Sequence, residues 1–125
     1  MDEVEHEKFA FACEKIAHRI KKMNIKNIYG IPRGGSVVAV YLSHLSELPI
    51  IEEPMFKDET LIVDDISDTG KTLNAYKHFG YKIATIYYHK QSIVEPDIWI
   101  YEKKDDWVLF PWETIESTKN PGVVV

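Results

Sequence analysis

Short apolar runs that alternate with helix-length segments constrain the fold of this 125-residue chain more than any other feature. Each run has the length and the β-branched content of a strand, and several are apolar at every position. The expected strands are residues 25–31, 48–51, 61–63, 83–88 and 98–101, and the expected helices are residues 3–23, 36–47 and 71–79. Strands that are apolar on both faces are typical of a parallel sheet covered by helices. The sequence therefore predicts an α/β fold with such a sheet.

Composition and charge narrow the class of protein. With 45% hydrophobic and 28% charged residues the chain has a globular composition, and we expect one domain spanning residues 1–125. Its net charge of −5 argues against a nucleic-acid-binding surface, which would be basic. The single cysteine, Cys13, excludes an internal disulfide framework. Neither a signal segment nor a membrane-length apolar run is evident, so a soluble, cytoplasmic protein without membrane contact is expected.

The most informative motif follows the apolar run at residues 61–63. Two adjacent carboxylates, Asp64 and Asp65, end that run, and a Thr-Gly-Lys-Thr sequence at 69–72 opens the next helix. Free backbone N–H groups, hydroxyls and the positive end of a helix dipole form a phosphate cradle there. The carboxylates then suit either a pair of sugar hydroxyls or a Mg²⁺ ion that bridges to further phosphate.

This motif has three other possible interpretations. The two carboxylates could cap a turn at a strand end, but a turn seldom needs both ahead of a phosphate cradle. Residues 70–72 match the second half of a P-loop, yet the leading glycine would fall at position 65, which is Asp65. A phosphoacceptor receiver domain opens with a similar acidic run, but it needs later strands that do not fit into the 60 residues after Asp65.

Two further strand ends carry unusual residues. Pro-Arg-Gly-Gly at 32–35 presents the Arg33 guanidinium beside exposed amides, which suits a second anion such as pyrophosphate, although an ordinary turn with a solvent-facing arginine is the alternative. Lys90 follows another strand, and Trp107 and Trp112 come later. A lysine near aromatic rings could hold a flat heterocycle, or the tryptophans could simply pack the sheet edge.

Together these residues resemble a known family. The run from Asp64 to Thr72 is similar to the phosphoribosyl-pyrophosphate (PRPP) signature of type I phosphoribosyltransferases, and residues 30–35 resemble the pyrophosphate loop of that family. Asp-Trp-Val at 106–108 and Pro-Trp-Glu at 111–113 resemble a run in the xanthine-guanine phosphoribosyltransferases. The resemblance implies a Rossmann-like parallel sheet with a small C-terminal hood that binds the base.

For the phosphate and sugar groups, the resemblance implies one site made of two loops. Asp64 and Asp65 would bind the ribose hydroxyls, with Mg²⁺ held nearby at Asp65. The 5′-phosphate would lie in the cradle formed with Asp68 by Thr69, Gly70, Lys71 and Thr72. Arg33, Gly34 and Gly35 would bind pyrophosphate, and a non-proline cis peptide is typical of that loop.

For the base, the resemblance implies a purine nucleophile and four residues. Asp68 would accept the purine proton, Lys90 would bond the 6-oxo group, Trp107 would stack on the ring, and Val108 would offer backbone contacts. The implied reaction transfers the phosphoribosyl group of PRPP to guanine, xanthine or hypoxanthine and releases pyrophosphate. A homodimer or a higher homo-oligomer is the assembly expected for the family.

One departure from the family stands out. The family inserts a long mobile loop between its second and third strands, but only the eight mostly acidic residues 52–59 fill that place here. A short loop predicts poorer exclusion of water, and with it either slow turnover or a substrate that covers itself. The alternative hypothesis is a catalytically weak or inactive protein that binds PRPP or a nucleotide as a regulator.

Overall fold

Helices and strands alternate in the computed structural model, which describes residues 2–104 and 108–114. The elements in chain order are β1 (Asp2–Glu3), α1 (His6–Ile20), β2 (Asn27–Gly30), α2 (Gly34–Ser46), β3 (Thr60–Ser67), α3 (Lys71–His78), β4 (Lys82–His89), β5 (Ile98–Lys103) and β6 (Val108–Leu109). This order confirms the predicted α/β class.

The main sheet consists of four parallel strands in the order β2-β3-β4-β5. Residues 60–63 of β3 and 83–87 of β4 are buried, because these central strands are covered on both faces. Gly30 of β2 pairs with Val63 of β3. This register brings the loop after β2 and the carboxylates after Val63 to the same edge of the sheet.

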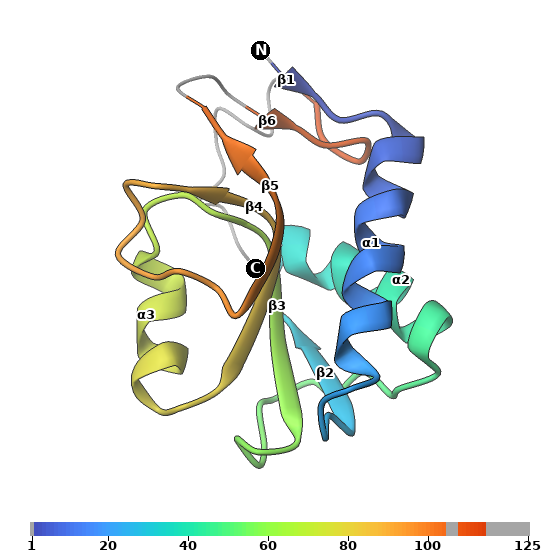
Figure 1. Cartoon of the computed structure of the whole chain (residues 1–125), viewed down its shortest axis with the longest axis vertical. Coiled ribbons are helices and arrows are strands. Elements are labelled where there is room, and N and C mark those ends of the chain that lie inside the picture. Colours follow the sequence, from blue (N-terminus) through green and yellow to red (C-terminus); the bar gives the residue numbers. More distant parts are fainter. Residues whose placement is uncertain (1, 105–107, 115–125) are drawn as a thin grey trace.

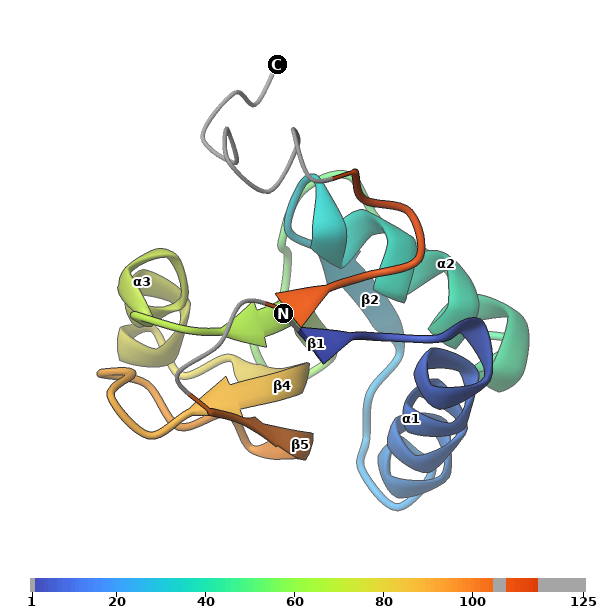
Figure 2. The same ribbon diagram turned by 90° about the horizontal axis from the view of Figure 1, so that it is seen from above.

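Helices cover the two faces of the sheet unequally. Figures 1 and 2 show α1 and α2 together on one face and α3 on the other. Side chains of β3 alternate between these layers: Leu61 and Val63 pack in the core under α1 and α2, while Ile62 packs with Leu73 of α3. Val94, between β4 and β5, joins the smaller core on the α3 side.

The direction in which successive strands are added to the sheet changes between β2 and β3. After α2 it passes the outer edge of β2, where Ile50 forms a parallel bridge with Ile28. It then starts β3 on the other side of β2, with α2 and α3 on opposite faces (Figure 1). Ligands of open α/β sheets bind outside the carboxyl ends of strands at such a switch point. The fold therefore predicts a ligand site at the loops after β2 and β3.

Two expectations about the strands need correction. Residues 48–51 form a single bridge at Ile50 instead of a strand, because Pro49 has no N–H to donate and the chain turns away after Ile51. The strand expected at 61–63 runs on to Ser67, so that Asp64 and Asp65 lie within β3 and not after it.

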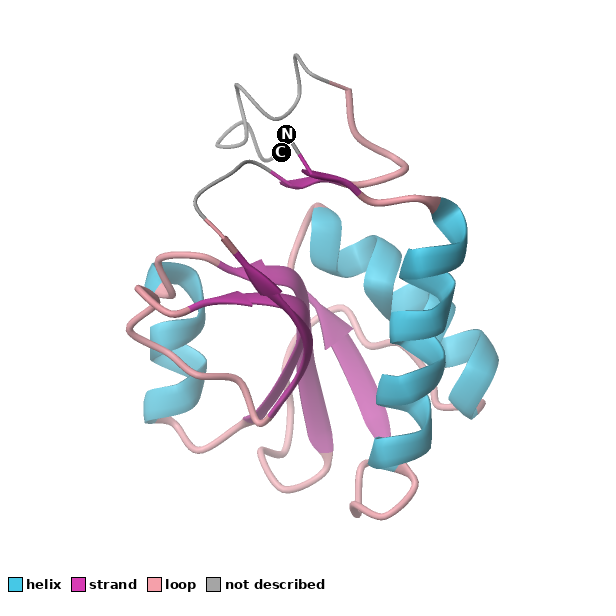
Figure 3. Cartoon of the chain, turned by 45° about the horizontal axis from the view of Figure 1, so that its top comes forward, coloured by secondary structure: helices cyan, strands magenta, loops and turns pink. Residues whose placement is uncertain are grey.

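A small second sheet lies at the carboxyl end of the main one. β1 pairs with β6 in parallel, and Figure 3 shows this pair apart from the four-stranded sheet. Phe110 and Trp112, which follow β6, are stacked at 4.9 Å, and Trp112 also packs on Phe9 of α1. β6 and the segment after it therefore form a small C-terminal hood, and its binding of a base stays a prediction. Within the described residues, no helix is long and apolar enough to cross a membrane.

Candidate active site

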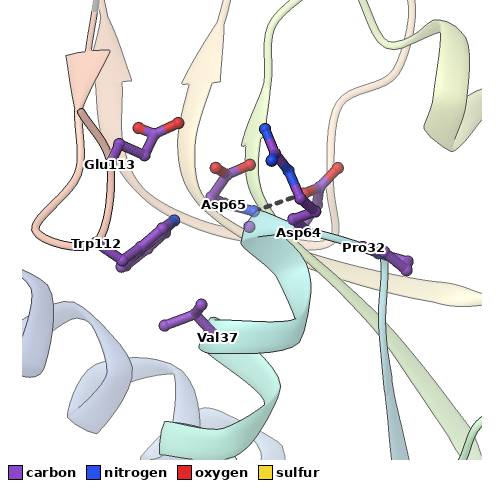
Figure 4. Close-up of a pocket in the computed structure, with 8 residues that line it drawn as sticks. Pro32, Val37, Asp64, Asp65, Trp112 and Glu113 are labelled. Atoms are coloured by element: carbon purple, nitrogen blue, oxygen red, sulfur yellow. Dashed lines mark hydrogen bonds between the residues drawn. The ribbon is translucent and has the colours of Figure 1, made fainter. Parts of the chain in front are cut away.

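A pocket of about 350 Å³ opens between the carboxyl ends of β2 and β3. It is lined by Pro32, Arg33, Gly34, Val37, Asp64, Asp65, Trp112 and Glu113. Figure 4 shows the Trp112 ring and Val37 on one side, with the carboxyl groups of Asp65 and Glu113 beyond them. The two strand ends and the hood thus meet around one cavity, as the switch point predicts.

The loop after β2 packs directly on the end of β3. The peptide bond between Pro32 and Arg33 is cis, which confirms the expected non-proline cis peptide, and α2 begins at the next residue, Gly34. A Cβ atom at Gly34 would overlap the Asp65 carboxylate, and one at Gly35 would lie 2.5 Å from the Val63 carbonyl oxygen. Glycine is required at Gly35 because only a bare backbone can approach the β3 backbone this closely, whereas a side chain at Gly34 would displace the Asp65 carboxylate.

Asp64 and Asp65 form an adjacent acidic pair within β3. The Asp65 amide donates a hydrogen bond of 2.8 Å to Oδ1 of Asp64 (Figure 4). Burial, with the adjacent Asp65 charge as a second cause, raises the pKa of Asp64 well above its usual range. Burial also raises the pKa of Asp65, against the lowering effect of its hydrogen bonds. Two carboxylates in this state favour a ligand that supplies positive charge or hydroxyl donors.

A second pocket, of about 150 Å³, lies at the start of α3. It is lined by Asp64, Ile66, Ser67, Asp68, Thr69, Gly70, Lys71, Thr72 and Leu73. Gly70 has a φ of 81° and immediately precedes the first turn of α3. Its amide-rich surroundings and the helix N-terminus have the composition of a phosphate cradle. The predicted cradle residues are therefore brought together.

The turn after β4 packs against the loop that lines this second pocket. The amide of Ile93 donates to the Thr69 carbonyl at 2.9 Å, and the hydroxyls of Ser67 and Ser92 are 2.7 Å apart. A Cβ atom at Gly70 would overlap the Ser92 hydroxyl. Residues 67–70 are thus held in place by the turn after a neighbouring strand, a contact that no sequence motif indicates.

Asp68 receives side-chain donors from two other segments. Nζ of Lys103, in β5, lies 3.0 Å from its Oδ2, and Nε2 of Gln91 lies 3.3 Å from its Oδ1. The Asp68 side chain is 40% exposed, whereas that of Lys103 is only 13% exposed. Sequence analysis identified Asp68 but missed Lys103, which stands in a charged run that is typical of a solvated strand end.

The residues predicted to contact the purine base do not lie together in the structure. Lys90 is outside both pockets: its side chain is 80% exposed and pairs with Glu102 at 3.4 Å. Val108 lies in β6 of the hood. Trp107 lies outside the described residues. The role of each toward a base stays a prediction.

Glu113 is a pocket residue that sequence analysis did not single out as a functional residue. Its Oε1 accepts a 3.0 Å hydrogen bond from the Phe110 amide. Burial raises the pKa of Glu113, the Asp65 charge adds to the increase, and the Arg33 guanidinium opposes it. The resemblance of residues 111–113 to the family was the signal that could have found it.

The segment at 52–59 lies at the amino ends of the strands, on the side of the sheet away from the pockets. The backbone carbonyl of Glu59, just before β3, accepts hydrogen bonds from the Lys26 and Asn27 amides at the start of β2. The Tyr81 hydroxyl, just before β4, donates to the Met55 carbonyl at 2.6 Å. These contacts tie the segment to the amino ends of the strands. It is therefore absent from both described pockets, as the short loop predicts.

Comparison with known proteins identifies the family. A purine phosphoribosyltransferase from Pyrococcus horikoshii matches with 30% identity and a TM-score of 0.77, covering 91% of this chain and 96% of that one. The chain belongs to the type I phosphoribosyltransferase family. It is also 29% identical over 113 residues to a xanthine-guanine phosphoribosyltransferase from Desulfotalea psychrophila, covering 71% of each.

A more distant structure supports the fold of this phosphoribosyltransferase. The xanthine-guanine-hypoxanthine phosphoribosyltransferase of Helicobacter pylori has a TM-score of 0.77 at 17% identity, over 96% of this chain and 98% of that one. No protein-family model matches the sequence. The relatives place this phosphoribosyltransferase near the purine enzymes, which are glycosyltransferases by class.

Proposed function

We propose that this phosphoribosyltransferase transfers the phosphoribosyl group of PRPP to a 6-oxopurine and releases pyrophosphate. The observation that carries the proposal is that Asp64 lines both pockets. One pocket contains the arginine loop and the other the phosphate cradle, so a ligand with anions at both ends and sugar hydroxyls between them would span the pair. PRPP has that arrangement of groups.

The residues of the two loops then take complementary roles. Arg33 and the amides of Gly34 and Gly35 would bind pyrophosphate, while Asp64 and Asp65 accept hydrogen bonds from the ribose hydroxyls. The 5′-phosphate would bind in the cradle of residues 69–72. Because all of these groups are held by packed strand ends, they would fix PRPP in a geometry suited to reaction before the base arrives.

The bond changes follow from this placement. The bond from the ribose C1 carbon to the pyrophosphate oxygen breaks, and pyrophosphate leaves with that electron pair. A purine nitrogen donates its lone pair to the same carbon, which forms the new glycosidic bond. Asp68 would accept the proton that the purine gives up. Arg33 would stabilise the negative charge that grows on the leaving group.

The acidic pair also fits a Mg²⁺ ion. Its carboxylate oxygens are hard ligands, and burial, which raises the pKa of both groups, disfavours their charged forms unless a cation is bound beside them. The described residues form no group of three or more metal-ligating side chains, so Asp65 would share the ion with substrate oxygens. When bound, Mg²⁺ supplies charge neutralisation for pyrophosphate.

The choice of a 6-oxopurine rests on the relatives and on the hood. The relatives from Desulfotalea psychrophila and Helicobacter pylori are named for xanthine, guanine and hypoxanthine. Lys90, Trp107 and Val108 remain the residues we propose to contact the base, with Lys90 turning from Glu102 to do so. A homodimer and a cytoplasmic location are proposed on the resemblance alone.

A second candidate function is supported by the position of residues 52–59. A protein whose site is not covered by that segment could bind PRPP or a nucleotide without efficient transfer. The deciding experiment measures pyrophosphate release from PRPP and Mg²⁺ with hypoxanthine, guanine, xanthine, adenine or no base. Release that depends on an oxopurine supports the transferase. Binding of PRPP in calorimetry without base-dependent release would refute it and favour the second candidate.

A further inference from the structure

A largely but not fully buried lysine on β5 contacts the proposed proton acceptor. Lys103 has a side chain that is 13% exposed, and its ammonium lies 3.0 Å from Oδ2 of Asp68. Taking an ammonium group out of water is costly unless a charged partner compensates. A fully exposed ion pair contributes little stabilising free energy, but the low exposure of Lys103 distinguishes this pair from such surface contacts.

The neighbouring charges show that this pairing is selective. Lys90 and Lys104 are 80% and 78% exposed, and both pair with Glu102, at 3.4 and 2.9 Å. Because successive side chains of a strand point to opposite faces, Glu102 and Lys103 face different ways on β5. The two exposed lysines therefore stay on the Glu102 side, and Lys103 alone among these three is directed at Asp68.

The second oxygen of Asp68 is held from another segment. Nε2 of Gln91 lies 3.3 Å from Oδ1, so the two carboxylate oxygens have different donors, one from β5 and one from the turn after β4. Asp68 itself lies in the loop between β3 and α3 and is 40% exposed. Two donors from separate elements restrict the rotation of its carboxylate more than one could.

We propose that Lys103 is a positioning residue that orients the Asp68 carboxylate toward the purine. This inference rests on the proposed function, in which Asp68 accepts the purine proton. Lys103 acts through Asp68 and need not touch the substrate. The consequence is that removing the ammonium lowers the rate of transfer while leaving the binding of PRPP almost unchanged, because the phosphate and ribose groups are held by other residues.

The test compares Lys103→Gln with Lys103→Arg and with Lys104→Gln, the matched control from the adjacent exposed position. We expect Lys103→Gln to lower kcat by about tenfold to a hundredfold, with the KM for PRPP within about twofold of the wild-type value. Lys103→Arg retains the charge and restores most of the rate. Lys104→Gln leaves both constants unchanged. Equal effects of the two Gln variants, or a change confined to KM, would overturn the inference.

A double-mutant cycle with Asp68→Asn tests whether Lys103 acts through Asp68. In the Asp68→Asn background, adding Lys103→Gln is expected to change kcat by less than about twofold. A full and independent loss in that background would refute the positioning role. Circular dichroism of every variant separates this loss from misfolding.

One readout keeps this inference separate from the proposed function. The carboxyl ¹³C resonance of Asp68, assigned by its loss in Asp68→Asn, should move in Lys103→Gln and stay in place in Lys104→Gln. This measurement needs no turnover. A wild-type protein without base-dependent pyrophosphate release would refute the proposed function, whereas an unmoved resonance would refute the contact that the inference requires.

Discussion

Replacing Asp64 by asparagine should stabilise the ligand-free protein at neutral pH and impair its activity. Asp64 and Asp65 are partly buried neighbours in β3, and burial with mutual repulsion raises the pKa of Asp64. The amide side chain of asparagine removes one charge and keeps a carbonyl oxygen that can accept the 2.8 Å hydrogen bond from the Asp65 amide. The substitution therefore removes the repulsion with little loss of packing.

The expected gain can be bounded from electrostatics. Two like charges about 5 Å apart repel by roughly 3 kcal/mol at an effective dielectric constant of about 20. Adjacent residues keep part of this repulsion in the unfolded chain, so a net gain of about 1–2 kcal/mol in the free energy of unfolding is expected. For a domain of this size that gain corresponds to a rise in Tm of about 4–8 °C.

The gain must also depend on pH in a definite direction. A carboxyl whose pKa is raised on folding binds more protons in the folded state than in the unfolded state. Wild-type stability therefore falls as the pH rises from the ordinary aspartate value near 4 through the raised pKa of Asp64. Below about pH 4 the carboxyl is protonated in both states, and the advantage of asparagine disappears.

Thermal unfolding of both proteins between pH 4 and pH 8, with EDTA present, measures this difference. Asp58→Asn, at an exposed carboxylate, is the control and should stay within about 0.5 kcal/mol of wild type. Equal melting temperatures at pH 8, or the same gain at pH 4 as at pH 8, would show that the acidic pair is not destabilising.

Three further predictions concern the loops and the core. Gly34→Ala places a Cβ atom against the Asp65 carboxylate, so pyrophosphate release should fall by about a hundredfold or more; an unchanged rate would mean that the loop moves freely. Asp68→Asn should lower kcat by about a hundredfold to ten-thousandfold with nucleotide affinity in calorimetry nearly intact, and surviving activity would remove Asp68 from its proposed role. Burial and the nearby Glu14 raise the pKa of Cys13 to about 12, so about one thiol in ten thousand is ionised at pH 8 and Ellman's reagent should react only after denaturation.

The sequence predicts the fold and the loops after β2 and β3 well, because both follow from patterns within short segments of the chain. The apolar runs at 61–63 and 83–88 can be satisfied only by burial on both faces, which requires helices on either side. Arg33 follows β2 and the acidic pair lies in the carboxyl-terminal half of β3, and parallel strands bring their carboxyl ends to one side of the sheet. Their meeting around one pocket is therefore a consequence of the strand order.

The parts that were missed depend on contacts distant in sequence. Lys103 belongs to a run of charged residues, and nothing in that run reveals which lysine turns inward; the register of β5 on β4 decides it. Glu113 reaches the pocket because the chain after β6 folds back over α1 and α2. Lys90 was expected in the site from its place after a strand, but its neighbour Glu102 on β5 pairs with it instead.

The position of residues 52–59 at the amino ends of the strands has a kinetic consequence. In enzymes whose covering loop must open before product leaves, that motion often limits turnover. Here the corresponding segment is tied to the amino ends of β2 and β4 and takes no part in enclosing the pockets. Under the proposed function, the release of pyrophosphate and nucleotide would not require this segment to open. We therefore expect no pre-steady-state burst of product and no dependence of kcat on solvent viscosity; either one would show that another motion limits release.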